Sequence, residues 1–455
     1  MKVLILAAGL GKRMNSKYPK VVHKILGKPM INWVIDLAKN FGEVGVVVGH
    51  KAEIVISYLP RDVKVYIQEP QLGTGHAIMC ARDFLSKSEE LLVLYGDVPL
   101  LSKNTIQKLI EEHKSTGSEV TVLTFITDNP TGYGRIVRES DVKKRIRIVE
   151  EKDANEEEKK IREVNSGIYV FNGRFILENL DKLSNENAQG EYYLTDLVGL
   201  AQQVSTVQTD DILEVSGVND RVQLAKLEAV ARQRILERLM KEGVTIVDPS
   251  STFVGPDVVI GRDTIIQPFT IIEGETKIGE DCEIGPYSHI IDSIIGREVK
   301  IIRSEIEKST IEDKVSVGPF SRLREGTVLK ESVKIGNFVE TKKSVIGKNS
   351  KAQHLTYLGD ATVGEDVNVG AGTITCNYDG FKKYQTQIGD GAFIGSNSSL
   401  VAPVRIGNGA IVGAGSVITE DVPDNALALG RARQIIKENW AKIKREAMKN
   451  ANNKE

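Results

Sequence analysis

Short apolar runs alternate with stretches of helical periodicity over the first half of the chain, from Met1 to about Asn219. This alternation is typical of an α/β domain, in which helices separate the strands. We therefore expect a Rossmann-like, mostly parallel sheet with ligands at the carboxyl ends of its strands. The runs predict strands at Lys2–Leu6, Val44–Val48, Val63–Ile67, Leu91–Leu94 and Val120–Thr124, and helices near Met30–Lys39, Gly75–Phe84 and Lys103–His113.

A long helix is predicted from residue 220 to residue 242, where the sequence contains neither Gly nor Pro. At 1.5 Å per residue this helix would be roughly 35 Å long. It would bridge the α/β half and a second half with a different periodicity. Its apolar residues recur at helical spacing, namely Leu224, Leu227, Ala231, Ile235 and Leu239.

Beyond Asp248 the apolar residues recur every six positions. Small or turn-forming residues often follow the aliphatic ones, as in Ile260-Gly261 and Ile394-Gly395. Such a hexapeptide repeat predicts a parallel β-helix, in which each aliphatic side chain points inward. The alternative is an array of short antiparallel strands. The two strict series are Ile260, Ile266, Ile272, Ile278, Ile284, Ile290 and Ile388, Ile394, Leu400, Ile406, Val412, Ile418.

The repeat is interrupted between Thr375 and Ile388, which predicts an external loop of the kind that often carries function. A helix is predicted near the end of the chain, from Ala432 to Met448. These features divide the sequence into four parts. They are an α/β domain at 1–219, a linker helix at 220–242, a repeat domain at 243–430 and a tail at 431–455.

The composition restricts the partners of this protein. The 60 Lys and Arg and 62 Asp and Glu leave a net charge of −2, so we expect no general binding to nucleic acid. No apolar run approaches the ~20 residues of a membrane span, and we expect the N-terminus to form a strand of a cytoplasmic protein rather than a leader. Cys80, Cys282 and Cys376 are too widely spaced to indicate a disulfide framework or a zinc cluster.

A glycine-rich turn follows the first predicted strand, with Gly9 and Gly11 ahead of Arg13 and Lys20. Glycines let backbone N–H groups approach phosphate oxygens, and the two cations supply charge for a polyphosphate. The spacing matches neither a Walker loop nor the dinucleotide-binding fingerprint, which disfavours ATPase and NAD-dependent activities. The turn therefore predicts a polyphosphate site of another class.

Two further motifs face the same edge of the predicted sheet. The turn from Gln71 to His76 opens a helix and is placed to meet a base or a phosphate. His76 on its own would be a packed or capping histidine. Asp97 follows the strand Leu91–Leu94, and a carboxylate there is typical of a Mg²⁺ ligand, since Mg²⁺ takes one or two protein oxygens together with substrate phosphates. The alternative is that Asp97 only caps the next turn.

In the repeat half, Arg324 and Lys342 are separated by 18 residues, which is one full coil. They should stack on the same side and suit a phosphate, although a solvated charge ladder is an alternative. His354 lies twelve residues beyond Lys342, so it should occupy another face of the same coil or the cleft of a neighbouring subunit. With Tyr357 and the loop residues Asn377 and Tyr378 nearby, His354 is a candidate general base.

These motifs resemble those of the sugar nucleotidyltransferases and, more narrowly, of the bacterial bifunctional N-acetylglucosamine-1-phosphate uridyltransferase/glucosamine-1-phosphate acetyltransferases. The resemblance spans roughly residues 2 to 440. The motifs that carry it are LAAGLGKRM, YPKVVH, QEPQLGTGHA, LYGDVPL, NPTGYGRI, VEEKDA, VNSGIYV, NAQGEYYLTD, GVNDR and KKSVIGKNSKAQHLTYLGDATVGEDVNVGAGTITCNYDG. Lys12 and Glu325 stand where the family more often has Thr and Pro.

For the N-terminal half, the resemblance implies that Arg13 and Lys20 are catalytic and that Asp97 and Asn219 bind Mg²⁺. Within the nucleotide and sugar site, it implies uracil contacts from Gln68, Gly73 and Thr74 and amino-sugar contacts from Gly134, Glu150 and Asn165. The full set of implied UTP and UDP-N-acetylglucosamine contacts is Leu6, Ala7, Ala8, Gly9, Lys20, Gln68, Gly73, Thr74, Tyr95, Gly134, Glu150, Asn165 and Asn219.

For the repeat half, the resemblance implies a left-handed parallel β-helix, a homotrimer built through it, and acetyl-CoA held between subunits. His354 would be the catalytic base. The implied glucosamine-1-phosphate contacts are Arg324, Lys342, Tyr357 and Asn368, and the implied acetyl-CoA contacts are Ala371, Asn377, Tyr378, Ser396, Ala414 and Arg431.

The function predicted is therefore a pair of reactions in UDP-N-acetylglucosamine synthesis. Acetyl-CoA first acetylates glucosamine-1-phosphate, and the product then reacts with UTP and releases pyrophosphate. One alternative is a single-reaction pyrophosphorylase with a structural β-helix, and another is a non-enzymatic trimerisation scaffold with a nucleotide-sensing domain. Thiol release from acetyl-CoA and pyrophosphate release from a nucleoside triphosphate distinguish the three, because only the bifunctional enzyme shows both.

Overall fold

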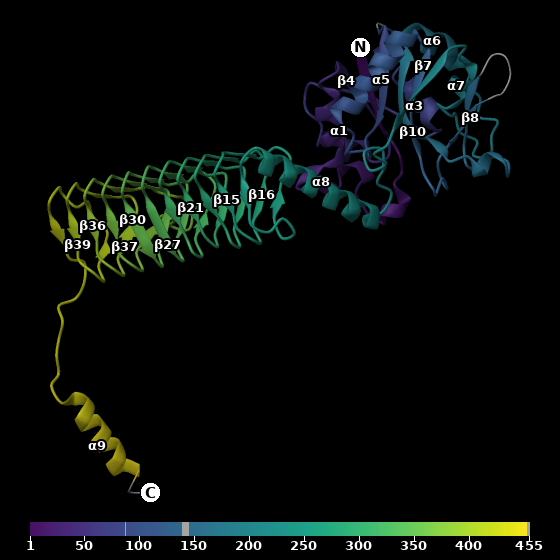
Figure 1. Ribbon diagram of the computed structural model, residues 1–455. Coiled ribbons are helices and arrows are strands. Elements are labelled where there is room, and N and C mark those ends of the chain that lie inside the picture. The colour runs from purple at the N-terminus through teal and green to yellow at the C-terminus, as the bar shows by residue number, and fades with distance from the viewer. Residues whose placement is uncertain (87, 139–144, 453–455) are drawn as a thin grey trace. The chain divides into compact units, whose positions relative to one another are not determined.

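The computed structural model describes residues 1–86, 88–138 and 145–452. Its contacts divide the chain into two compact units (Figure 1). The first comprises Met1–Arg238 with Val254–Pro256, and the second comprises Leu239–Phe253 with Asp257–Glu455. No helix among the described residues is long and apolar enough to cross a membrane.

One mixed sheet organises the N-terminal unit, in the order β11-β7-β10-β6-β1-β4-β5, with a β8–β9 hairpin attached to β10. The five strands expected from the apolar runs are confirmed. The parallel pairings are β5-β4-β1-β6 and β11-β7. The strands are β1 (Lys2–Ala7), β4 (Glu43–Val48), β5 (Lys64–Ile67), β6 (Glu90–Tyr95), β7 (Val120–Ile126), β8 (Arg135–Arg138), β9 (Ile146–Val149), β10 (Glu163–Asn172) and β11 (Val204–Thr209).

The expectation of a mostly parallel sheet is wrong at β10, which runs antiparallel to both β6 and β7. Parallel neighbours need a crossover connection, usually a helix. Between β7 and β10 the described residues form the hairpin and a short 3₁₀ turn instead of an α-helix. The chain therefore re-enters the sheet in the opposite direction.

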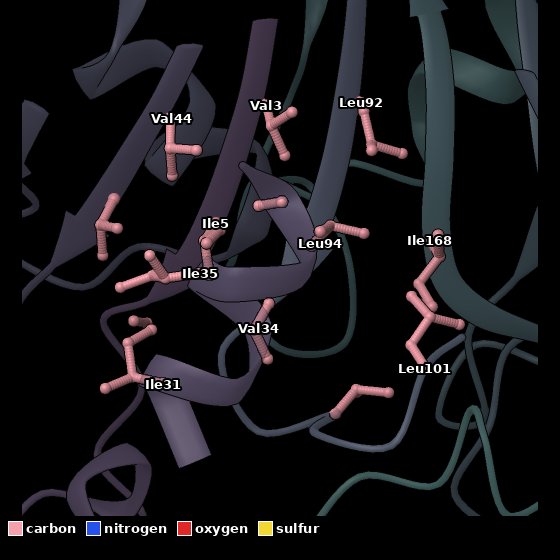
Figure 2. Packing of buried hydrophobic residues seen from close by; sticks show 14 of the residues in the cluster. Val3, Ile5, Ile31, Val34, Ile35, Val44, Leu92, Leu94, Leu101 and Ile168 are labelled. Carbon is pink, nitrogen blue, oxygen red and sulfur yellow. The ribbon is translucent and has the colours of Figure 1, made fainter. Parts of the chain in front are cut away.

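Helices cover both faces of this sheet, and alternate residues of β1 point to opposite sides. Val3 and Ile5 pack with Ile31 and Ile35 of α1 (Met30–Ala38), as Figure 2 shows. Leu4 belongs to the cluster on the other face. Because both faces are buried, β1 is apolar along its length instead of alternating. The remaining helices are α2 (Ala52–Ile56), α3 (Thr74–Cys80), α4 (Arg82–Leu85), α5 (Lys103–Thr116), α6 (Gly173–Asn179) and α7 (Asp196–Leu200).

The helix expected over Gly75–Phe84 is divided into α3 and α4, because Ala81 has φ −102° and leaves the helical region. The long helix α8 (Arg221–Lys241) lies where the sequence predicts one. Most of its length packs on the N-terminal unit. Glu228 accepts a hydrogen bond from the Leu26 N–H at 3.2 Å, and Arg234 donates to the Leu100 carbonyl at 3.0 Å.

The C-terminal unit is a parallel β-helix whose short strands form three sheets in the described part of the chain (Figure 1). One of these sheets contains β15 (Ile265–Ile266), β21 (Lys300–Ile301) and β27 (Lys334–Asn337). We name the sheets by their first strands, β12 (Thr245–Ile246), β13 (Phe253–Val254) and β14 (Val259–Ile260). From β15 to β40 each strand pairs with the third strand before it, so every turn of chain visits all three sheets. The pairings are parallel, and the antiparallel alternative is therefore wrong.

The hexapeptide residues form the core of the β-helix. Ile266, Ile272 and Ile284 are fully buried, and Ile260 stacks directly on Ile278. Burying one such side chain contributes about 1.5–3 kcal/mol. The following position must be small, since a Cβ on Gly261 would lie 2.6 Å from the Glu280 backbone nitrogen.

The predicted loop lies between β34 (Ile374–Cys376) and β35 (Thr386–Ile388), and Phe381 at its tip is 93% exposed. The helix expected from Ala432 begins later, as α9 (Trp440–Asn452). Asn439 has φ 57°, which is incompatible with a right-handed helix and prevents an earlier start. Residues 453–455 of the predicted tail lie outside the described residues.

Candidate functional site

The predicted residues of the N-terminal half line two cavities of about 350 and 540 Å³ at one edge of the sheet. Both cavities are lined by Thr74, Tyr95 and Asp97, so they meet at the end of β6. The first is lined by Leu6, Ala7, Ala8, Gly9, Lys20, Gln68 and Gly73, and the second by Arg13, Gly134, Glu150, Asn165 and Asn219.

Lys20 and Asp97 form an ion pair where the two cavities meet. The Lys20 ammonium also donates to Asn219 Oδ1 at 3.3 Å. Gly11, with φ 59°, allows this arrangement, because a Cβ there would lie 2.8 Å from Lys20 Cβ. Three segments that are remote in the sequence thus meet at one point.

Asp97 and Asn219 fit a Mg²⁺ ion that is held mainly by its substrate. Their two oxygens converge on one cation, the Lys20 ammonium. No cluster of three or more His, Cys, Asp or Glu side chains suited to a metal occurs among the described residues. Mg²⁺ is commonly bound in this way, by one or two protein oxygens and substrate phosphates.

The turn after β5 shapes the first cavity. Gly73 has φ 101°, and a Cβ there would lie 2.6 Å from the Tyr192 carbonyl, so only glycine fits. Gln68 is 3% exposed and donates through Nε2 to the Gly73 carbonyl at 2.8 Å. Burial raises the pKa of Tyr95, and the Glu150 and Asp97 charges raise it further, so its phenol stays protonated.

Glu150 and Asn165 lie in the second cavity. Thr195 donates to Glu150 Oε1 at 3.0 Å, but burial outweighs this bond and raises the pKa of Glu150. Asn165 Nδ2 donates to the Tyr169 hydroxyl at 2.6 Å. Sequence reasoning missed Thr195 and Tyr169, although both lie within motifs of the resemblance, NAQGEYYLTD and VNSGIYV.

In the β-helix, Arg324 and Lys342 occupy equivalent positions of adjacent coils, as their 18-residue spacing predicts. β25 (Arg322–Leu323) pairs with β28 (Glu340–Lys342), and the Arg324 N–H donates to the Thr341 carbonyl at 2.9 Å. Glu340 pairs with Arg324 at 2.8 Å. The Lys383 ammonium beside Lys342, together with Arg324, lowers the pKa of Lys342.

Lys383, which was not among the predicted site residues, extends the cationic pair to a cluster of three. It comes from the loop that interrupts the hexapeptide repeat, opposite Tyr378. The interruption of the hexapeptide repeat was the sequence feature that could have pointed to Lys383. Asn377 at the base of the same loop donates to Asp360 at 2.6 Å, and the Asp360 N–H donates to the Lys342 carbonyl. We call the three cations Arg324, Lys342 and Lys383, together with the neighbouring Asn377, the cation group.

Tyr357 reaches toward the cation group from the start of β31 (Tyr357–Gly359). A Cβ on Gly359 would lie 2.3 Å from the Tyr357 hydroxyl, so the phenol occupies the space above this glycine. Gly359 in turn pairs with Lys342. The tyrosine hydroxyl therefore lies over the position next to Lys342.

His354 occupies a different face, as expected from its offset from Lys342. It ends β30 (Lys351–His354) in the β12 sheet, whereas Lys342 lies in the β13 sheet. Successive coils then place Ala371, Ser396 and Ala414 in line with it, because the Gly372, Asn397 and Gly415 N–H groups donate to the His354, Ala371 and Ser396 carbonyls. Arg431 lies near Gly415 at the end of this line.

We call His354, Ala371, Ser396, Ala414 and Arg431 the corner column. Asn368 begins β33 (Asn368–Val369) on the adjoining β12 sheet, paired with Lys351. The structure thus separates the implied acetyl-CoA residues. Four belong to the corner column, whereas Asn377 lies in the cation group and Tyr378 on the adjacent loop, where its side chain is 59% exposed.

Together, the fold and the two sites define a nucleotidyltransferase domain joined to a hexapeptide-repeat transferase domain. Family models agree. Residues 3–161 match a MobA-like NTP transferase domain, 285–369 a GlmU-like C-terminal hexapeptide, and 385–420 a bacterial transferase hexapeptide of six repeats.

Full-length relatives make the assignment specific. The chain is 80% identical over 455 residues to the bifunctional protein GlmU of Fervidobacterium nodosum and 66% identical over 455 residues to that of Thermosipho africanus, covering 100% of each chain. It is 58% identical over 447 residues to that of Thermotoga maritima, covering 98% of this chain and 100% of the relative.

The chain belongs to the GlmU family of bifunctional uridyltransferase/acetyltransferases, which act in UDP-N-acetylglucosamine synthesis. The predicted family, fold class and activity are confirmed. A single-reaction pyrophosphorylase and a non-enzymatic scaffold are the two alternatives that this membership excludes.

Proposed function

We propose that the β-helix unit first transfers an acetyl group from acetyl-CoA to the amine of glucosamine-1-phosphate, and that the N-terminal unit then joins the product to UTP. The observation that supports uridylyl transfer by the N-terminal unit is the meeting of Lys20, Asp97 and Asn219 where two cavities join. Such a junction suits two phosphate-bearing substrates. Because UTP and acetyl-CoA are metabolites of the cell interior, we place both reactions in the cytoplasm.

In uridylyl transfer, a phosphate oxygen of N-acetylglucosamine-1-phosphate attacks the α-phosphorus of UTP in line, and pyrophosphate leaves. The protein's task is to position the substrates and to neutralise charge. Arg13 and Lys20 face the phosphates, while Asp97 and Asn219 would hold Mg²⁺, which supplies further charge stabilisation when bound. The uracil lies in the cavity of Gln68, Gly73 and Thr74.

The amino sugar lies in the second cavity, against Gly134, Glu150 and Asn165. A Cβ on Gly134 would lie 2.8 Å from the Ile148 side chain and 3.6 Å from Glu150 Oε1, so the glycine leaves space beside the carboxylate. Glu150 and Asn165 then offer oxygen acceptors to the N–H and hydroxyl groups of the sugar.

In acetyl transfer, the amine of glucosamine-1-phosphate attacks the thioester carbonyl and gives up a proton to His354. The C–S bond then breaks, and the departing sulfur takes this proton back from His354, so that coenzyme A leaves as the thiol. A protonated amine is not a nucleophile, so this step requires a proton acceptor. The cation group and Tyr357 hold the sugar phosphate together with Asn368. The corner column lines the coenzyme.

We further propose that the enzyme is a homotrimer in which the acetyl-transfer site lies between copies. Within one chain the cation group and the corner column occupy different corners of the coil. A neighbouring copy can bring its cation group to the column, which explains why the implied acetyl-CoA residues are divided between the two.

Exposed aromatic side chains support this interface. Phe269, Tyr287, Phe320 and Phe338 are each at least 50% exposed and follow the corner that leads to His354. The rings of Phe269 and Tyr287 stack at 4.9 Å, and those of Phe320 and Phe338 at 5.4 Å. Arg303 lies between the two pairs, with its guanidinium carbon 5.6 Å from the centre of the Tyr287 ring and 5.9 Å from that of the Phe320 ring. The four rings and this guanidinium form one exposed ladder, and a large exposed surface of this kind marks a protein contact site.

Mixed oligomers test this arrangement. Lys342→Ala and His354→Ala chains should each lack acetyl transfer. Refolded or co-expressed together, they should regain about a quarter of the wild-type sites if the copies associate at random. The absence of any rescue, with mixing verified by differently tagged chains, would show that one chain supplies both groups.

A further inference from the structure

His76 was expected to be a packed or capping residue, and the function described above does not use it. Its ring lies on α3 behind the base cavity. His76 Nδ1 is 3.2 Å from Gln68 Nε2, and His76 Nε2 is 3.8 Å from Cys80 Sγ. These contacts connect the histidine to a residue proposed to meet the uracil.

The hydrogen bonds determine which way the Gln68 amide faces. The Gly73 carbonyl can only accept, so the amide atom 2.8 Å from it must be the NH₂ group. The same nitrogen is the atom next to His76 Nδ1. His76 Nδ1 must therefore accept, which places the proton of the neutral ring on Nε2, facing Cys80.

This arrangement leaves Gln68 Oε1 for a ligand. Within the described ranges, no hydrogen bond ends on this oxygen, and it is not among the side-chain atoms that are buried without a partner. Gln68 lines the base cavity even though its side chain is almost wholly buried. A carbonyl oxygen held in a fixed orientation therefore faces the position of the base.

We infer that His76 is a positioning residue that holds the Gln68 amide so that the cavity selects a base with an imide N–H, as in uracil, over cytosine. Uracil N3 carries a hydrogen that Gln68 Oε1 can accept. Cytosine N3 carries a lone pair that would face the same oxygen. A polar group held in place rejects such a ligand because both lone pairs stay unpaired. This inference rests on the proposed uracil contact of Gln68.

The test compares His76→Leu with His76→Asn in the full-length enzyme. Leu removes the acceptor, whereas Asn can present Oδ1 where Nδ1 lies. The quantity measured is kcat/KM for UTP divided by kcat/KM for CTP. We expect His76→Leu to lower this ratio about tenfold, the scale of one hydrogen bond. His76→Asn should keep the ratio within about twofold of wild type, and Cys80→Ala should do so as well, since it leaves the acceptor in place.

Two results would overturn the inference. One is an unchanged ratio in His76→Leu. The other is an equal loss in His76→Asn, which would show that the ring acts by its shape. Gln68→Ala distinguishes a failure of the proposed uracil contact from a failure of the role of His76. If it lowers the ratio while His76→Leu does not, the uracil contact stands and only the role of His76 fails. If Gln68→Ala leaves the ratio unchanged, the proposed uracil contact itself is wrong.

Discussion

The two units build their sites in different ways. In the N-terminal unit, residues 77 and 199 positions from Lys20 meet it at one point, so a single chain completes the centre. In the β-helix, Arg324, Lys342 and the corner column come from successive coils in register, and the cation group and the corner column lie at different corners. The comparison shows that a regular repeat aligns residues along its axis, but that it cannot bring two of its own corners together.

The largest expected effect is the loss of acetyl transfer at the β-helix site. His354→Ala should lower acetyl transfer by about 10²–10⁴-fold, the usual cost of removing a general base, and should spare uridylyl transfer. His289→Ala is the matched control, because His289 is another histidine of the β-helix and its ring pairs with Glu273 and Glu305, outside both proposed groups. Retention of more than about a tenth of acetyl transfer in His354→Ala would show that another group takes the proton.

Asp97→Asn should impair only the uridylyl transfer of the N-terminal unit. It removes the carboxylate paired with Lys20, so Mg²⁺-dependent uridylyl transfer should fall at least about tenfold, as for other losses of metal support. Acetyl transfer should stay at the wild-type level. Asp181→Asn, which removes a surface partner of Arg82, is the control. Normal UTP turnover in the Asp97 variant would contradict the assignment of the metal site.

Lys383→Ala tests a residue of the cation group that lies outside the repeat. Losing one of three clustered cations should raise KM for glucosamine-1-phosphate about tenfold, the scale of a hydrogen bond to a charged group, with a smaller change in kcat. Lys382→Ala removes the neighbouring loop cation as a control. Equal effects of the two substitutions would mean that the loop contributes only net charge.

The aromatic ladder offers a test of the proposed trimer. Phe320→Ala with Phe338→Ala should shift sedimentation toward smaller species at low protein concentration, because interface aromatics typically contribute about 1–2 kcal/mol each or more. Phe381→Ala is the control, since Phe381 is exposed on the loop and lies outside the ladder. An unchanged trimer at all concentrations would place the interface on another face.

The smallest expected effect is on stability. Burial raises the pKa of Glu150, so ionising it in the folded protein costs free energy. That contribution favours folding below the usual pKa of a glutamate and is lost as pH rises through the elevated value. Glu150→Gln should therefore raise the melting temperature at neutral pH by about 2 °C, and the gain should vanish in acid. A gain that does not depend on pH would indicate improved packing instead.

Much of the β-helix followed from the sequence, because its period sets its register. A spacing of 18 residues stacks Arg324 on Lys342, and the interruption after Thr375 predicts the loop. In the N-terminal unit the sequence determined the strands and the glycine turns, since these depend on local composition. Gly73 and Gly11 occupy backbone conformations with positive φ.

Only the tertiary structure decided which distant residues meet. The ion pair of Lys20 with Asp97 and the position of Lys383 beside Lys342 both depend on contacts between segments with no shared period. The same holds for β10, whose direction follows from the connection before it. Local patterns specify which elements form, whereas their juxtaposition depends on burying both faces of the sheet and satisfying every polar group at its edge.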